Sequence, residues 1–288
     1  MHKQKVGLHV SASGGAANAP ERAKKLGAEC FQFFSRSPRG GTASKITKEI
    51  EQSFKEKCHE YKMESYIHTP YYINFAALNK SIAKNTERII TEELERATQL
   101  GVSYVITHLG SAKDWSGANS DHIPNGALKQ TIEGLKTVYK DSPKGGAQLL
   151  LEISAGAGAV IGNSFEDLAY IIKKLAKRNI HTCLDTAHML ATGYDIRTTD
   201  AVDKTMKEFH KHLGKERLKL VHMNDSKVDL GERKDRHEHI GKGKVGINGF
   251  KALLAHKYLQ NVNFILETKH DEYIEKDLAL LKKWRKIK

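Results

Sequence analysis

One unit repeats eight times along this chain of 288 residues: a short apolar run, a polar loop and an amphipathic stretch. The apolar runs have the length and composition of strands, and the amphipathic stretches repeat their apolar residues at helical spacing. We predict strands at residues 5–10, 30–34, 65–68, 104–108, 148–153, 181–185, 218–223 and 264–268. We predict helices at residues 20–26, 48–61, 82–100, 127–139, 165–176, 200–212, 247–254 and 271–286.

Eight strands that alternate with eight helices indicate an α/β fold, the (β/α)8 TIM barrel, which takes about 250 residues. An open doubly wound sheet would use fewer strands and a glycine-rich phosphate turn early in the chain. Residues 11–15, SASGG, are rich in glycine but lack the spacing of that turn. No linker or change in composition divides the chain, so we predict a single catalytic domain over residues 1–288.

The charge of the chain favours a polyanionic partner. Its 47 Lys and Arg against 34 Asp and Glu give a net charge of +13, and nucleic acid is the first candidate for such a surplus. No segment is apolar enough to cross a bilayer, and the chain enters its first strand without a signal-peptide pattern, so we expect an intracellular, cytoplasmic protein with no membrane partner. Its three scattered cysteines argue against a disulfide framework and a thiolate metal site.

Each of six consecutive predicted strands has a side chain that can bind metal at its last or next-to-last position. These side chains are His68, His108, Glu152, Asp185, His222 and Glu267. In a parallel barrel all strand carboxyl ends face one mouth, so the six should converge on one cavity. A single strand-end histidine is more often structural, but six such positions are hard to obtain from packing alone. Buried carboxylates placed together would also repel one another without cations among them.

Three further residues extend this cluster. His188 follows Asp185 by three positions, at the turn into the next loop, and Asp235 and His237 lie two positions apart in an extended loop. Five histidines and four carboxylates suit three metal ions with bridging carboxylates, and ligands without sulfur suit zinc or manganese. Three divalent ions would attract a phosphodiester and activate a water against it. The residues therefore predict metal-dependent phosphodiester hydrolysis without specifying the bond.

These motifs resemble those of the endonuclease IV family of apurinic/apyrimidinic (AP) endonucleases, over nearly the whole chain. The matching segments are residues 7–11 (GLHVS), 108–111 (HLGS), 151–156 (LEISAG), 184–188 (LDTAH), 193–197 (GYDIR), 222–227 (HMNDSK), 235–237 (DRH), 239–243 (HIGKG) and 266–269 (LETK). The resemblance implies a TIM barrel that cuts double-stranded DNA on the 5′ side of an abasic site and leaves a 3′-hydroxyl. We expect it to act as a monomer.

The resemblance also implies a role for each of the nine residues. The first zinc would be held by His68, His108 and Glu152, the second by Glu152, Asp185, His222 and Glu267, and the third by His188, Asp235 and His237. Glu152 would bridge two ions and is our catalytic residue, and a hydroxide between those two ions would be the nucleophile. Arg39 and Tyr71 match positions that contact DNA in the family. Gly40 and Gly41 stand where relatives carry bulky side chains that enter the duplex.

Two alternatives remain open at this point. Sugar isomerases similar to xylose isomerase hold one or two metals with a set equivalent to Glu152, Asp185, His222 and Glu267, but that function leaves the other five residues and the positive charge without a role. A DNA-binding protein with structural metals would instead have closed tetrahedral sites. Steep loss of binding with salt would favour a nucleic-acid substrate over a sugar.

Overall fold

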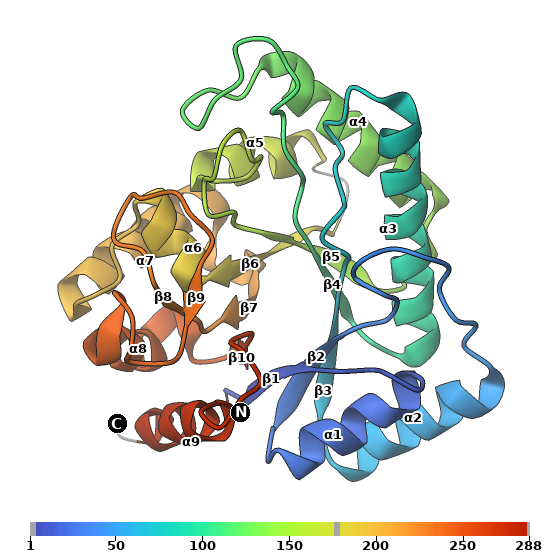
Figure 1. Cartoon of the computed structure of the whole chain (residues 1–288), viewed down its shortest axis with the longest axis vertical. Coiled ribbons are helices and arrows are strands. Elements are labelled where there is room, and N and C mark those ends of the chain that lie inside the picture. The colour runs from blue at the N-terminus through green and yellow to red at the C-terminus, as the bar shows by residue number, and fades with distance from the viewer. Residues whose placement is uncertain (1–3, 176–178, 287–288) are drawn as a thin grey trace.

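Eight parallel strands close into a barrel in the computed structural model, which describes residues 4–175 and 179–286 (Figure 1). They are β1 (Val6–Val10), β2 (Cys30–Phe34), β3 (Glu64–His68), β4 (Tyr104–Thr107), β5 (Gln148–Glu152), β6 (His181–Asp185), β7 (Leu218–His222) and β10 (Asn263–Leu266). Each pairs with the strands before and after it in this order, and β10 pairs with β1 to complete the ring. The predicted TIM barrel is confirmed.

Helices surround the barrel and connect its strands (Figure 1). They are α1 (Ala19–Lys25), α2 (Lys48–Glu60), α3 (Lys80–Leu100), α4 (Asn125–Asp141), α5 (Phe165–Lys174), α7 (Thr199–Leu213), α8 (Gly246–Ala255) and α9 (Ile274–Arg285). Each matches a predicted helix, and the largest difference is at α9, which begins at Ile274 and not at Asp271. The predicted end of α5 at Ala176 lies outside the described residues. Capping explains several ends: the side chain of Asn79 accepts hydrogen bonds from the first turn of α3, and Gly101 ends that helix with φ of 75°.

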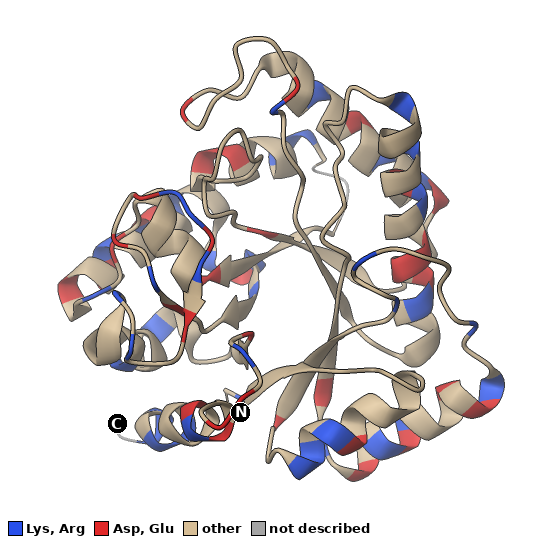
Figure 2. Cartoon of the chain, viewed as in Figure 1, with Lys and Arg blue, Asp and Glu red and all other residues tan. Residues whose placement is uncertain are grey.

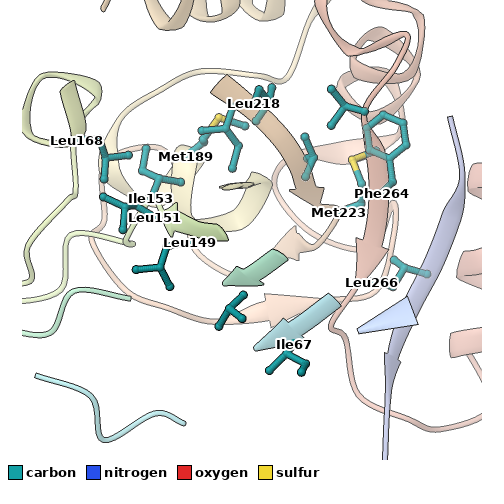
Figure 3. Close-up of a cluster of buried hydrophobic side chains, with 14 of the residues drawn as sticks. Ile67, Leu149, Leu151, Ile153, Leu168, Met189, Leu218, Met223, Phe264 and Leu266 are labelled. Carbon is teal, nitrogen blue, oxygen red and sulfur yellow. The ribbon is translucent and has the colours of Figure 1, made fainter. Parts of the chain in front are cut away.

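The strand side chains alternate between two apolar clusters. The smaller cluster takes one residue from each of seven strands: Cys30, Tyr66, Ile106, Leu150, Cys183, Leu220 and Ile265. Their neighbours in sequence, such as Leu149 and Leu151, belong to the larger cluster with helix residues such as Leu168 (Figure 3). Since successive strand side chains point to opposite faces, the smaller cluster fills the barrel interior and the larger one lies between barrel and helices.

Short elements that the sequence did not predict follow two of the strands. Helix α6 (Thr186–Thr192) comes directly after β6, and β8 (Asp225–Ser226) pairs antiparallel with β9 (His237–Glu238) in the segment after β7. There are also 3-10 helices, η1 (Ala16–Asn18), η2 (Lys215–Arg217) and η3 (Lys257–Leu259). His188 therefore lies in a helix and not in a turn, and His237 lies in a β-ribbon and not in a plain loop.

Four strands end earlier than predicted: β4, β5 and β7 by one residue, and β10 by two. β4 ends at Thr107 and β10 ends at Leu266, so His108 and Glu267 are the first residues beyond their strands. The ladder between β4 and β5 runs out at the pair Thr107 and Leu151, which leaves the His108 backbone outside the sheet. Both side chains still leave the barrel at its carboxyl end, where the prediction placed them.

The outer helices carry most of the charge, with Lys and Arg interspersed among Asp and Glu (Figure 2). Among the described residues, no helix has both the length and the apolar content that a membrane span requires.

The loop that follows β2 is held against α3 by a buried ion pair. Nε of Arg36 lies 2.5 Å from Oε1 of Glu93, and Nη2 of Arg36 lies 2.7 Å from Oε2 of Glu92. The Arg36 and Glu93 side chains are only 2% and 0% exposed. Arg96 adds hydrogen bonds to two backbone carbonyls of the same loop. These contacts fix the start of the segment that carries Arg39.

We expect Glu93→Gln to lower the free energy of unfolding by about 3–5 kcal/mol, because it leaves the buried Arg36 charge without its main partner. Urea denaturation followed by circular dichroism measures the change. Glu95→Gln is the matched control, since Glu95 is exposed on the same helix, and its effect should stay within about 0.5 kcal/mol. Equal stability of the two variants would contradict the prediction.

Candidate metal centre

A polar layer lies directly above the apolar cluster inside the barrel. Residues two apart on a strand point to the same face, so each inward apolar residue is followed by another inward side chain. In chain order from β2 to β10 these side chains are Gln32, His68, His108, Glu152, Asp185, His222 and Glu267. On β1 the residue paired with Gln32 is His9. All six predicted strand-end ligands therefore occupy one layer at the carboxyl end of the barrel.

A cavity of about 280 Å³ opens onto this layer. It is lined by His9, Phe34, His68, Tyr71, His108, His188, Asp235, His237, Glu267, Thr268 and His270. The lining includes side chains from the loops after the strands, among them the predicted ligands Asp235 and His237. The barrel and its loops thus enclose a single site.

His68, His108 and Glu152 form the first group, with one ligand atom from each within 4.8 Å of the others. Nε2 of His68 lies 3.1 Å from Oε2 of Glu152, and Nε2 of His108 lies 3.4 Å from the same oxygen. Nδ1 of His68 donates to the backbone carbonyl of Thr69 at 2.7 Å. This bond leaves the Nε2 lone pair of His68 facing Glu152, as a metal ligand requires.

Glu152, Asp185, His222 and Glu267 form the second group, so Glu152 belongs to both. Nδ1 of His222 lies 3.0 Å from Oε1 of Glu152 and 3.1 Å from Oε2 of Glu267. Burial alone would raise the pKa of Glu152, but the neighbouring His108 and His222 hold that pKa well below its usual value. Glu152 is therefore a fully buried carboxylate that the site keeps ionised.

His188 reaches the third group from α6. Asp185 caps this helix, since Oδ1 accepts from the His188 backbone N–H at 2.8 Å, and Nδ1 of His188 donates to the Ile153 carbonyl at 2.9 Å. Burial lowers the pKa of His188, but the carboxylates of Asp185 and Asp235 raise it to about 10. Helix α6 thus places the His188 imidazole with its Nε2 toward the cavity.

Asp235 joins the two histidines of this group from the loop before β9. Its Oδ2 lies 3.3 Å from Nε2 of His188, and its Oδ1 lies 3.2 Å from Nε2 of His237. Asp185 also lies here, because its ligand atom is within 4.8 Å of those of His188 and His237. Asp185 was predicted in the second group alone, whereas its carboxylate stands between the second and third groups.

These groups fit divalent cations. The Nε2 atoms of His188 and His237 are buried and have no hydrogen-bond partner among the described residues, although buried polar atoms normally have one. Each of these nitrogens instead lies close to a carboxylate oxygen of Asp235, and a cation would satisfy both kinds of atom. Imidazole and carboxylate ligands without thiolate suit zinc or manganese.

Comparison with known proteins identifies the family. A family model described as "Xylose isomerase-like TIM barrel" matches residues 20–284. The protein called "Probable endonuclease 4" from Carboxydothermus hydrogenoformans is 38% identical over 281 residues, which cover 97% of this chain and 96% of the relative. The chain belongs to the endonuclease 4 family.

Solved structures agree with this endonuclease 4 assignment. Endonuclease IV from Thermus thermophilus matches with a TM-score of 0.87 and 30% identity, over 99% of this chain and 100% of that one. A D-tagatose 3-epimerase-like protein matches with a TM-score of 0.74 and 19% identity, over 98% and 97% of the two chains. The second likeness concerns the barrel fold alone.

The two predicted DNA contacts of this endonuclease 4 family member differ in position. Tyr71 lines the cavity and is 71% exposed, with its ring 5.3 Å from that of Phe34. Arg39 is exposed on the loop after β2 and is not among the residues that line the cavity. Gly40 and Gly41 follow it with φ of 115° and 98°, and a Cβ added to either would meet open space. Tyr71 therefore lies at the candidate metal centre, whereas Arg39 lies outside it.

Two residues that were not predicted as site residues lie beside the predicted ligands in this endonuclease 4 barrel. Gln32 hydrogen-bonds to His222 and Glu267, and His9 is hydrogen-bonded to Gln32. A polar residue inside the apolar run CFQFF was the available signal for Gln32. Asn224, within the motif HMNDSK, connects two predicted ligands: its Nδ2 donates to Oδ2 of Asp185 at 2.6 Å and to Oε2 of Glu267 at 3.4 Å.

Proposed function

We propose that this chain is a metal-dependent AP endonuclease, a phosphodiester hydrolase that cuts double-stranded DNA on the 5′ side of an abasic site and leaves a 3′-hydroxyl. The observation that carries the proposal is the convergence of three imidazole and carboxylate groups on one cavity, with Glu152 shared by two of them. The names of relatives such as the one that is 38% identical over 96% of its length support DNA as the substrate. We propose that it acts as a monomer on DNA inside the cell.

We propose that three zinc ions, or manganese at some positions, fill the centre. They would be held by His68, His108 and Glu152, by Glu152, Asp185, His222 and Glu267, and by His188, Asp235 and His237. Bound ions would turn a shared water into the hydroxide nucleophile near neutral pH and stabilise the charge on the phosphate and the departing 3′ oxygen. Glu152 directs one carboxylate oxygen to each of two groups, which would fix the spacing between the two ions.

Tyr71 and Arg39 are the proposed DNA contacts of the chain. An exposed aromatic ring at the rim of the cavity can stack on the bases beside a displaced abasic nucleotide. Arg39 can bind backbone phosphate from its exposed loop. Gly40 and Gly41 offer no side chain to insert into the duplex. We therefore propose that Tyr71 contributes more to keeping the duplex open than it would in a relative with bulky side chains at those two positions.

The direct test is incubation of the zinc-loaded protein with a labelled duplex that carries one abasic analogue, beside an undamaged duplex. We expect a single cut 5′ to the lesion with a 3′-hydroxyl end, and no cut in the undamaged duplex. The products are resolved on a denaturing gel and tested for extension by a polymerase. Failure to cut either duplex with zinc present in the protein would refute the proposal.

Binding of the duplex should weaken steeply with salt. Phosphate contacts release counterions, so about six to ten of them would reduce affinity on the order of 10³–10⁵-fold between 50 and 200 mM salt. Fluorescence anisotropy of a labelled abasic duplex measures this slope, with the chelator-treated protein as a comparison. A flat response would count against a nucleic-acid substrate.

A divalent-metal sugar isomerase is the alternative that such a flat response would favour. The group of Glu152, Asp185, His222 and Glu267 could serve that chemistry. The barrel fold, which the epimerase-like protein shares, is compatible with this alternative. It gives no role to the first and third groups, which a phosphodiester hydrolase would use. Structural metals in a DNA-binding protein are disfavoured by the cavity, because closed tetrahedral sites need no open face.

A further inference from the structure

Two residues of the polar layer, Gln32 and His9, are not among the nine proposed ligands. Gln32 lies in β2 with no exposed surface, and His9 is its pair in β1. A buried amide needs an acceptor for its N–H groups and a donor for its oxygen. The partners of Gln32 are two proposed ligands, His222 and Glu267, together with His9.

The chemistry of these partners fixes the orientation of the Gln32 amide. Its Nε2 lies 2.5 Å from Oε1 of Glu267, and its Oε1 lies 2.8 Å from Nε2 of His222. A carboxylate can only accept hydrogen bonds, so the NH₂ group must face Glu267. A flipped amide would set two oxygens against each other at that distance. The amide oxygen therefore faces His222.

This orientation selects one tautomer of His222. Because an amide oxygen can only accept, Nε2 of His222 must carry a hydrogen, and Nδ1 of the neutral ring, the form that binds metal, keeps its lone pair. Nδ1 is the atom that faces Oε1 of Glu152 at 3.0 Å and Oε2 of Glu267 at 3.1 Å. Gln32 thus leaves free the one nitrogen of His222 that stands among the carboxylates of the second group.

The Gln32 amide also fixes the orientation of the Glu267 carboxylate and the tautomer of His9. It occupies Oε1 of Glu267 and leaves Oε2, which faces His222, for the second group. Its other N–H points to Nδ1 of His9 at 3.0 Å, so the hydrogen of a neutral His9 must be on Nε2. His9 lines the cavity, and this tautomer gives its ring an N–H donor beyond the contact with Gln32.

We propose that Gln32 is a positioning residue of the metal centre: its amide makes Nδ1 of His222 and Oε2 of Glu267 the ligand atoms of the second ion, and makes His9 an N–H donor. The inference rests on the metal centre of the proposed function and is independent of the bond that is cut. Residues that orient metal ligands in this way typically contribute about 10–100-fold to metal affinity.

The first test is metal binding by Gln32→Leu, which keeps the side-chain volume and removes both kinds of hydrogen bond. We expect one ion per chain to bind about 10–100-fold more weakly in competition with a zinc chelator. We also expect the visible spectrum of the cobalt-substituted protein to change. Gln4→Leu is the matched control, because Gln4 is a buried glutamine with two hydrogen bonds at the opposite end of β1. Wild-type affinity and spectrum in a folded Gln32→Leu would overturn the proposal.

The second test uses the unaltered protein, so it holds even if the variant does not fold. In the zinc-loaded protein labelled with ¹⁵N-histidine, long-range proton–nitrogen spectra show which ring nitrogen carries hydrogen. We expect His222 to be protonated on Nε2 with Nδ1 bound to metal, and His9 to be protonated on Nε2. Metal on Nε2 of His222 would exclude the proposed role. Neither test uses DNA, so loss of zinc in Gln32→Leu stands even if the abasic duplex is not cut.

Discussion

Glu152→Gln is expected to reduce cleavage of the abasic duplex by on the order of 10³-fold, the upper range for removal of a single electrostatic group from an active site. Oε2 of Glu152 faces the imidazoles of His68 and His108, and its Oε1 faces Nδ1 of His222. An amide offers only one oxygen, and its NH₂ group cannot bind a cation. One of the two groups must therefore lose its shared ligand.

The folded barrel should survive this substitution. Glutamine has the shape of glutamate and places no new charge in the buried layer, so circular dichroism and the urea midpoint should report a folded protein. Gel assays give the cleavage rate, and metal analysis of the same sample gives the ion content. Glu133→Gln, an exposed carboxylate on α4, is the control and should cleave like the unaltered protein. Retention of most activity in Glu152→Gln would show that Glu152 does not bridge the two groups.

The barrel and the convergence of six of the proposed ligands could be predicted because two periodicities act together. The alternation of apolar runs and amphipathic stretches gives the fold, and the spacing of two on each strand puts Glu152 and Asp185 in one layer above Leu150 and Cys183. Parallel strands then bring these positions to one end of the barrel. The pairing of metals with particular side chains came from the family resemblance and not from spacing.

Helix α6 escaped prediction because it has no polar face. Six of its seven residues are buried, so the periodicity that marks a surface helix is absent. Its end signals were nevertheless in the sequence: Asp185 caps the first turn, and Gly193, with φ of 111°, ends the last. The length of β8 and β9, two residues each, is too short to leave any pattern.

The role of Gln32 could not be predicted because it depends on contacts between residues far apart in the chain. Gln32 meets Glu267 at a separation of 235 residues and His222 at a separation of 190. Within the apolar run of β2, a single polar residue is equally consistent with a structural hydrogen bond to a neighbouring strand. Only the closed ring, which brings β2 close to β7 and β10 across the interior, reveals which groups the amide joins.

Removal of metal with a strong chelator should abolish cleavage and also destabilise the barrel. The buried carboxylates of Glu152 and Asp185 would lose the cations that balance them. When the free metal concentration is about 1,000 times the Kd, binding of each ion adds about 4 kcal/mol to the free energy of unfolding. We expect zinc to restore both properties, and manganese to restore them in part. Magnesium should fail, because it prefers an all-oxygen octahedral site whereas His68 and His108 offer nitrogen.

The measurement pairs the gel assay with thermal unfolding of the chelated protein before and after each metal is returned. Metal analysis should find three ions in the restored protein, and the thermal midpoint should rise stepwise as they bind. A chelated sample refilled with calcium is the control for ionic strength, and it should recover neither property. Cleavage that persists in the fully stripped protein would contradict the whole metal assignment. Recovery with magnesium alone would instead mean that the imidazoles of the first and third groups are not ligands, and the centre would have to be rebuilt around its carboxylates.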